Sequence, residues 1–484
     1  MKLLLVLVAL AIASCLQAQE WSAPVNVSNM NGGCDFPDYC IDNNGILHCV
    51  WVFQYQYFDR TIMYSRSTDN GTSWSAPIQI SENASLWMAK PQIKSDTQNN
   101  LHVIYNYDIP NLSQIHYRKH NGQNWEEIVN LSGNNGGQIN YCMSVDNNDK
   151  VYVFWGIANE EDYHSYYYLY SNNEWSDAIN PFPQSQDHYL ITTTIVDANN
   201  NLQCAGYFHL SNATFLQDKA GYTVYNSESD YWSDIVVFDV GAVRLYEGID
   251  ITLDVYDTPH IVWHVNNTGV YHVFFNGISW SDPVPLSVSQ TGLNQRVIID
   301  DTNTIHLVQQ ELTSITPYVI NNLFYYCSSD WERKQLTYSF NIAAYPKLIQ
   351  HVNTLYLLYA KNDTGYGGIT DVFMIKKQLW SDAIDDHEEV GVLPLTLFQN
   401  YPNPFCVETN IIFRSSSRSF ISLEVYNVKG QHIRTLYCGY CDKGDYDVLW
   451  DGRNSTGELQ PCGIYIYRAN SEDGSLLKRM ILLY

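Results

Sequence analysis

Basic residues are scarce in this chain of 484 residues. It has 26 lysines and arginines against 51 aspartates and glutamates, and a formal net charge of −25. Such an acidic protein repels the phosphates of nucleic acids and anionic membrane surfaces, so neither is an expected partner. Long apolar runs are also rare. Beyond the amino-terminal segment no stretch approaches the roughly 20 apolar residues of a membrane-spanning helix, and we expect no transmembrane segment in the mature chain.

The amino-terminal segment has the pattern of a targeting signal. Lys2 precedes an apolar run over residues 3–13, which is too short to cross a bilayer. We expect residues 1–18 to be a signal peptide that is cleaved after Ala18. Residues 12–15 also resemble a lipobox, in which Cys15 would be lipidated and retained. We favour ordinary cleavage because the other end of the chain supplies a surface address.

Tryptophan recurs along the chain with a spacing of about 50 residues, the sign of stacked supersecondary units. Most copies open a Trp-Ser-Ala-Pro or Trp-Ser-Asp phrase, and the copies are Trp21, Trp74, Trp125, Trp175, Trp232, Trp280, Trp331 and Trp380. Each unit contains short segments rich in β-branched and aromatic residues, separated by turns of Asn, Asp and Gly. Four strands joined by tight turns form a propeller blade. The spacing therefore predicts an all-β propeller of seven blades, with six or eight as alternatives, in which the strand at Trp21 is available to close the ring.

Histidine opens the second strand of several units, at His48, His102, His260 and His306. One shared position indicates one shared structural role, either packing or a hydrogen bond inside the blade. The Asp and Asn turns lack the ligand spacing of an EF-hand, so we expect no metal site and no cofactor there. The Cys438 and Cys441 spacing would suit zinc, but secreted domains more often oxidise such cysteines.

Residues 67–74 contain Ser67, Asp69, Gly71 and Trp74 in the order S-x-D-x-G-x-x-W. This segment resembles the Asp-box, or BNR repeat, of sialidase-like propellers. The resemblance implies a hairpin between the third and fourth strands of a blade, in which Ser and Asp bond the turn and Trp packs between strands. It implies a fold more than an activity, because the box lies away from the active site of that family.

The carboxy-terminal part resembles the sorting domain of proteins exported by the type 9 secretion system. An acidic linker at residues 385–392 precedes it, and the resemblance covers residues 393–484, including the run Asn400, Tyr401, Pro402, Asn403, Pro404 and Phe405. Its alternating strands predict an immunoglobulin-like sandwich. The resemblance implies that the type 9 machinery is a partner and that the protein is secreted or held at the outer surface of a Gram-negative bacterium. Residues 19–384 would then form the propeller.

Catalytic residues are harder to find. A sialidase requires three arginines that converge on a carboxylate, together with a tyrosine nucleophile, a glutamate and an acid/base aspartate. The Arg-Ile-Pro motif of that family is missing, and only Arg244 and Arg296 lie near first strands, where they could face a central channel. His188, Tyr246 and Glu247 are the other candidates on the channel face, where they would suit glycan binding or a lyase. The repeat alignment also places on this face Asp35, Lys90, Tyr141, Tyr189 and Tyr345, with Glu311 on one of the longer connections.

Three functions remain open on the sequence alone. The first, which we favour, is a noncatalytic propeller that binds a glycan or a surface protein. The second is a secreted polysaccharide lyase or glycoside hydrolase. The third is a structural component of the cell envelope.

Overall fold

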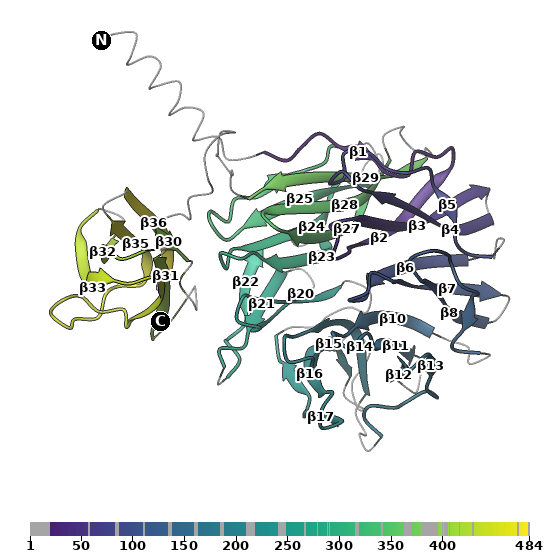
Figure 1. The fold of residues 1–484 in the computed structure, drawn as a ribbon, viewed down its shortest axis with the longest axis horizontal. Coiled ribbons are helices and arrows are strands. Elements are labelled where there is room, and N and C mark those ends of the chain that lie inside the picture. Colours follow the sequence, from purple (N-terminus) through teal and green to yellow (C-terminus); the bar gives the residue numbers. More distant parts are fainter. Residues whose placement is uncertain are drawn as a thin grey trace, which may run out of the picture.

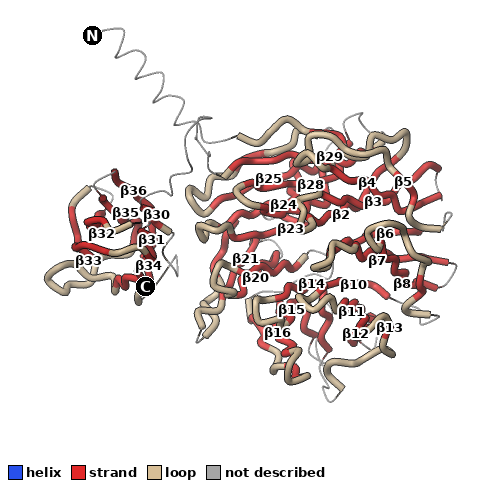
Figure 2. Tube along the Cα trace, viewed as in Figure 1, coloured by secondary structure: helices blue, strands red, loops and turns tan. Residues whose placement is uncertain are grey.

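The computed structural model describes residues 20–482 apart from residues 57–58, 83–86, 110–111, 134–137, 159–162, 184–187, 210–217, 241–247, 266–267, 278, 288, 290, 315–318, 340–341, 363–368, 380–394, 399, 401–404, 406, 416, 428–429 and 472–473. Within those residues all regular structure is β-strand, and Figure 2 shows no helix among them. The described residues accordingly contain no helix that is long and apolar enough to cross a membrane.

Seven antiparallel blades follow one another around a central axis, in the order of the sequence (Figure 1). Blades 3 and 4 are joined into one nine-stranded sheet by a parallel pair, His164 with Tyr189. Blade 1 has β2 (Gly33–Ile41), β3 (Leu47–Gln56), β4 (Asp59–Ser67) and β5 (Ile78–Gln79). Blade 2 has β6 (Trp87–Ser95), β7 (Leu101–Ile109), β8 (Leu112–His120) and β9 (Val129–Asn130). Blade 3 has β10 (Gln138–Val145), β11 (Val151–Ala158), β12 (Tyr163–Ser171) and β13 (Glu174–Trp175).

Blade 4 has β14 (His188–Val196), β15 (Leu202–His209) and β16 (Lys219–Asn226), with the outer edge shared by β17 (Tyr231–Trp232) and β18 (Val236–Phe238). Blade 5 has β19 (Ile249–Leu253), β20 (Pro259–Val265), β21 (Gly269–Phe274) and β22 (Val284–Ser287). Blade 6 has β23 (Gly292–Ile299), β24 (Ile305–Ser314), β25 (Ile320–Cys327) and β26 (Lys334–Gln335). The prediction of a seven-bladed all-β propeller is confirmed.

Blade 7 is completed by the amino-terminal end of the chain. Its strands β27 (Ala343–His351), β28 (Thr354–Asn362) and β29 (Thr370–Gln378) are joined by β1 (Val25–Asn26), which pairs with β29. The backbone N–H of Val27 donates to the carbonyl of Val372 at 2.8 Å, and Val27 is buried. The expectation that the strand at Trp21 closes the ring is confirmed.

A repeated chain of side chains links each blade to the next. In blade 2, Asp96 lies 3.3 Å from His102, whose other ring nitrogen is 2.7 Å from the Tyr117 hydroxyl. Trp175 of blade 3 then packs edge-on against Tyr117, with ring centroids 4.8 Å apart. The same order of contacts runs through Asp42, His48, Tyr64 and Trp125, and through Asp300, His306, Tyr325 and Trp21. The shared structural role predicted for the histidines is confirmed, and these tryptophans recur because each contacts the blade before its own.

The hairpin over residues 67–74 lies between β4 and β5, the third and fourth strands of blade 1. The Ser67 hydroxyl accepts the N–H of Gly71 at 2.9 Å, and Asp69 accepts the N–H of Ser73 at 2.8 Å. Hydrogen bonds from Ser73 lower the pKa of Asp69 to about 2. Gly71 has φ +76°, a conformation that glycine adopts without strain. Trp74 packs against the core of blades 1 and 7.

The carboxy-terminal part folds into a sandwich of two sheets. One sheet contains β30 (Leu395–Leu397), β31 (Thr409–Ser415) and β34 (Gly444–Trp450). The other contains β32 (Ser419–Asn427), β33 (His432–Cys441), β35 (Gly463–Ser471) and β36 (Gly474–Leu482). Two predicted motif residues are buried here. The backbone N–H of Asn400 donates to the Tyr467 hydroxyl oxygen at 2.6 Å, and Phe405 forms an isolated parallel β-bridge with Leu482. The other four motif residues, Tyr401, Pro402, Asn403 and Pro404, lie outside the described residues.

Candidate functional site at the central channel

The innermost strands of the blades carry a repeated irregularity. The register shifts at corresponding places in β2, β6, β14, β23 and β27, and slightly earlier in β10, as expected for β-bulges. Four residues at this position have positive φ without being glycine, namely Phe36, Lys90, Asn294 and Tyr345. Gly248 has φ +97° at the same place in blade 5. Bulges redirect side chains and often lie beside binding sites. The repeated bulges therefore set the backbone conformation at one end of the channel, which is called the mouth below.

Two connected cavities occupy the axis of the ring. The mouth cavity, of about 160 Å³, is lined by the bulge residues together with Tyr141, Tyr207 and Arg296. The channel cavity, of about 560 Å³, continues along all seven inner strands. Arg296, Lys347 and Gln92 line both cavities, so the mouth cavity adjoins the channel cavity.

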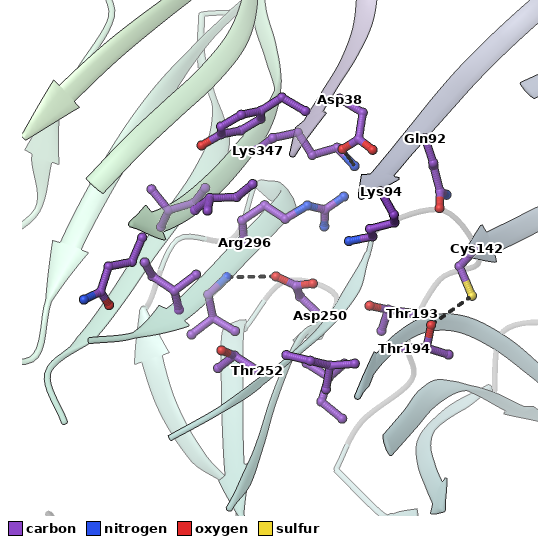
Figure 3. A pocket seen from close by; sticks show the side chains of 18 of the residues that line it. Asp38, Gln92, Lys94, Cys142, Thr193, Thr194, Asp250, Thr252, Arg296 and Lys347 are labelled. Atoms are coloured by element: carbon purple, nitrogen blue, oxygen red, sulfur yellow. Dashed lines mark hydrogen bonds and ion pairs between the residues drawn. The ribbon is translucent and has the colours of Figure 1, made fainter. Parts of the chain in front are cut away.

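One side chain from each inner strand occupies the same repeat position along the channel. Each pairs with the residue two places after the histidine position of the neighbouring strand. The seven residues are Asp38, Gln92, Cys142, Thr193, Asp250, Arg296 and Lys347 (Figure 3).

Three members of this row join neighbouring blades. Asp38 accepts the N–H of Ile93 at 2.9 Å, and Asp250 accepts the N–H of Val297 at 2.9 Å. Gln92 accepts the N–H of Met143 at 3.0 Å. Each of these side-chain oxygens accepts a backbone N–H of the next blade. The three polar residues therefore help to hold neighbouring blades together.

The remaining charges face the channel itself. Lys347 lies 3.1 Å from the second carboxylate oxygen of Asp38. Burial lowers the pKa of Lys347, and the repulsion of Arg296 and Lys94 adds to that effect, while Asp38 opposes it. Burial raises the pKa of Asp250, although Arg296 opposes this shift. The channel thus holds closely spaced charges in a partly desolvated environment.

Aromatic groups surround the mouth. The rings of Phe36 and Tyr345 lie 4.3 Å apart between centroids. The Tyr141 hydroxyl donates to the carbonyl of Lys90 at 2.8 Å and accepts the N–H of Asn106 at 3.1 Å. Burial raises the pKa of Tyr345 to about 12, so its phenol is protonated at neutral pH.

Of the five predicted catalytic candidates, the structure places Arg296 in the cavities. His188 opens β14, but its side chain lies outside the described residues. Arg244, Tyr246 and Glu247 also lie outside the described residues, as does Trp380. Their roles therefore remain predictions.

Other residues expected at the channel face divide into two groups. Lys90, Tyr141 and Tyr345 line the mouth. Tyr189 instead is buried and donates to the Gly221 carbonyl at 2.8 Å, and Glu311 is buried in an ion pair with Arg333 at 2.7 Å.

Sequence reasoning missed Lys94, Lys347, Asp38 and Asp250, all on first strands. Aligning first strands on the histidine of the second strand would have found these residues. Their channel position follows from a register that only the pairing of strands fixes.

Among the described residues, no group of three or more His, Cys, Asp or Glu side chains is arranged to hold a metal ion. Cys438 and Cys441 are free thiols, and Cys441 is buried.

Comparisons with known proteins agree with this architecture. The family described as the FlgD Ig-like domain matches residues 409–475, within the sandwich. No curated protein sequence matches the chain. Among solved structures, a polysaccharide lyase of family PL25, an ulvan lyase bound to -[GlcA(1-4)Rha3S]-, is 13% identical with a TM-score of 0.50. That match covers 74% of this chain and 96% of the lyase, and it supports the β-propeller fold.

Two further solved structures are similar over longer stretches. PorZ, a surface component of the type IX secretion system of Porphyromonas gingivalis, is 12% identical with a TM-score of 0.44. The match covers 93% of this chain, which spans 59% of PorZ. A mutant of Trypanosoma rangeli sialidase with trans-sialidase activity is 9% identical with a TM-score of 0.42, over 95% of this chain and 87% of the sialidase.

Proposed function

We propose that this protein is an exported, noncatalytic β-propeller that binds a glycan at the mouth of its central channel. The observation that carries this proposal is the mouth cavity, in which the Phe36 and Tyr345 rings lie beside polar side chains of Lys90, Asn294 and Arg296. Apolar rings with a few converging polar groups are typical of ligand sites. Aromatic faces offer stacking surfaces to sugars while the polar groups fix orientation.

The hydroxyl groups at the mouth favour binding over catalysis. Those of Tyr141 and Tyr207 are hydrogen-bonded to backbone groups that hold the bulged strands, at Lys90 and Gly248. The pKa of Tyr345, raised to about 12 by burial, does not suit a general base at neutral pH.

Export is supported by both ends of the sequence. Residues 1–18 have the pattern of a signal peptide, and residues 393–484 resemble a type 9 sorting domain. We therefore place the protein in the extracellular space or at the outer surface of a Gram-negative bacterium, with the type 9 machinery as its export partner. The Ser67–Trp74 hairpin is, on this proposal, an Asp-box that stabilises blade 1.

A polysaccharide array tests the function when it is measured for both retention and product formation. We expect retention of at least one glycan without release of reducing ends or unsaturated uronates. Tyr345→Ala should weaken retention by about tenfold through loss of the aromatic face. Tyr338→Ala is the matched control, because Tyr338 is 73% exposed and lines neither described cavity.

Each other outcome of the array contradicts the proposal. Release of products would identify a lyase or hydrolase. Absence of both retention and turnover would favour a structural envelope protein. Equal losses in the Tyr345 and Tyr338 variants would place the glycan outside the mouth.

A further inference from the structure

The charge balance of the channel differs from that of the whole chain. Acidic residues outnumber basic residues 51 to 26 in the whole sequence. The channel cavity is nevertheless lined by as many basic side chains, Lys94, Arg296 and Lys347, as carboxylates, Asp38, Asp250 and Asp301, among the residues that the structure describes. The mouth cavity adds Lys90. The axis of the ring therefore repels anions less than the acidic chain as a whole does.

Two of these cations form no close ion pair with the described residues, although the charge of Asp250 acts on Arg296. The Arg296 guanidinium donates to the carbonyl of Gln295 at 2.8 Å and makes no ion pair there. Lys94 makes neither a hydrogen bond through its side chain nor an ion pair with the described residues. Figure 3 shows both side chains extending into the same cavity from opposite sides, from β23 and β6.

Two of the three carboxylates in the channel already bind other groups of the protein. Asp38 bonds Ile93 through one oxygen and Lys347 through the other. Asp250 accepts the N–H of Val297. Burial is the main cause of the lowered pKa of Lys347, and the repulsion of Arg296 and Lys94 adds to it. A structural role would pair such cations with acids, as blade 6 does with Arg333 and the buried Glu311.

We propose that Lys94, Arg296 and Lys347 form an anion site inside the channel, which takes a carboxylate or sulfate group projecting from a glycan at the mouth. This assignment rests on the proposed glycan-binding function and specifies its ligand as an acidic glycan. Arg296 offers paired N–H donors that match the oxygens of such a group, and the lysines add positive charge. Because Arg296 and Lys347 line both cavities, a sugar stacked at the mouth can direct its acidic substituent downward.

The test uses the full-length protein with inorganic sulfate and with glucuronate, each compared with chloride at equal ionic strength. We expect saturable binding of at least one of the two by isothermal titration calorimetry. Lys94→Gln and Arg296→Gln should each weaken it by about tenfold, since a charge-assisted hydrogen bond to the ligand is lost. Arg296→Lys should recover part of the affinity.

Matched controls remove the same charge elsewhere. Lys150→Gln changes the turn that leads into β11, and Arg66→Gln changes an exposed side chain on β4. Neither residue lines a described cavity. Both should bind the anion as the unmodified protein does. Equal weakening in all four variants would overturn the site in favour of general charge attraction.

The two anions separate the two chemical sources. Binding of sulfate alone supports a sulfate ester, binding of glucuronate alone supports a uronate, and binding of neither overturns the site. Anion binding without retention of any polysaccharide would support the site and contradict the proposed function. Retention of a polysaccharide that Arg296→Gln and Lys94→Gln leave unchanged would support the function and overturn the anion site.

Discussion

The same residue type acquires different acid-base properties at one repeated position. Burial by itself favours the neutral form of a histidine and so lowers its pKa. In blade 6, bonds to Asp300 and Cys327 outweigh burial and raise the pKa of His306 to about 9. In blade 5, burial lowers the pKa of His260. The Nε2 atom of His272 lies 2.9 Å from Nδ1 of His260, and burial lowers the pKa of His272 well below 6.5. The neighbouring side chain therefore decides the charge.

His272 occupies the place that a tyrosine holds in blades 1, 2 and 6. Because the folded pKa of His272 is below its unfolded value of 6.5, the unfolded state binds more protons as the pH falls below that value. Stability is thus fully present above this pH and is lost under acid. We expect His272→Tyr to raise the unfolding free energy by about 1 kcal/mol at acidic pH and to reduce its pH dependence.

Urea unfolding at several pH values measures this effect. The reciprocal variant Tyr64→His, which places the same histidine pair in blade 1 beside His48, should become more sensitive to acid. A pH profile that is unchanged in both variants would show that the pair does not control acid stability.

Cys327 differs from the other described thiols of the propeller. Burial would raise its pKa, but hydrogen bonding to His306 lowers it to about 7, whereas burial raises the pKa of Cys34 to about 12. Since the thiolate is the reactive form, Cys327 should be alkylated by iodoacetamide at neutral pH well before the fully buried Cys49.

Peptide mass spectrometry of the native protein follows this reaction. His306→Gln should slow alkylation of Cys327 by about tenfold at neutral pH, because the imidazole that stabilises the thiolate is removed. Alkylation of Cys49 at the same rate as Cys327 would contradict the prediction.

At the scale of the strand, the recurrent feature is a series of side-chain contacts, here called the relay, that connects one blade to the next. The turn aspartate holds the second-strand side chain, which holds a third-strand tyrosine, and a tryptophan of the next blade packs on that tyrosine. In blade 4 a glutamine substitutes for histidine, with Gln203 bonded to Asp197 at 2.8 Å and to Tyr222, on which Trp280 packs at 4.6 Å. The relay therefore keeps the same order of contacts when glutamine replaces histidine.

Removing one hydroxyl from this relay should destabilise the ring. Tyr117→Phe leaves the buried Nδ1 of His102 without its partner, and we expect a loss of about 1–2 kcal/mol in unfolding free energy. Tyr338→Phe, at an exposed tyrosine, is the control and should change stability little. Equal stability of the two variants would mean that the relay contributes only packing.

At the scale of the whole molecule, the ring depends on pairing between its two ends. Trp21 packs against Tyr325 of blade 6 at 5.4 Å, the contact that Trp125 makes with Tyr64 and Trp175 with Tyr117. The residues just after the expected cleavage site therefore complete blade 7, and loss of this segment would leave β29 as an open sheet edge.

Deletion of residues 19–28 should lower the melting temperature of the propeller and increase aggregation through the exposed edge. Trp21→Ala should cost about 2 kcal/mol, since the tryptophan is only partly buried. Addition of a synthetic peptide of residues 19–28 should restore part of the lost stability, as measured by differential scanning calorimetry. An unchanged melting temperature after deletion would show that ring closure does not need β1.

The regular spacing of tryptophans and turns was enough to predict the blades, a favoured count of seven with six or eight as alternatives, and the closure at Trp21. These features depend on local periodicity and on one repeated contact, both of which are visible along the chain. The mouth was predicted only in part. Lys90, Tyr141, Tyr345 and Arg296 follow from the repeat, but Tyr189 and Glu311 turn inward to partners that sequence does not reveal.

The chain by itself thus determined the repeated strands, the acidic character and the resemblance of its two ends to export signals, because each is read from residue types or from residues close together in sequence. Only the tertiary structure decided that Lys94, Arg296 and Lys347, separated along the chain, share one cavity. A one-residue change in strand register or a bulge would turn these side chains elsewhere, and strand register is fixed by the packing of whole blades around the axis.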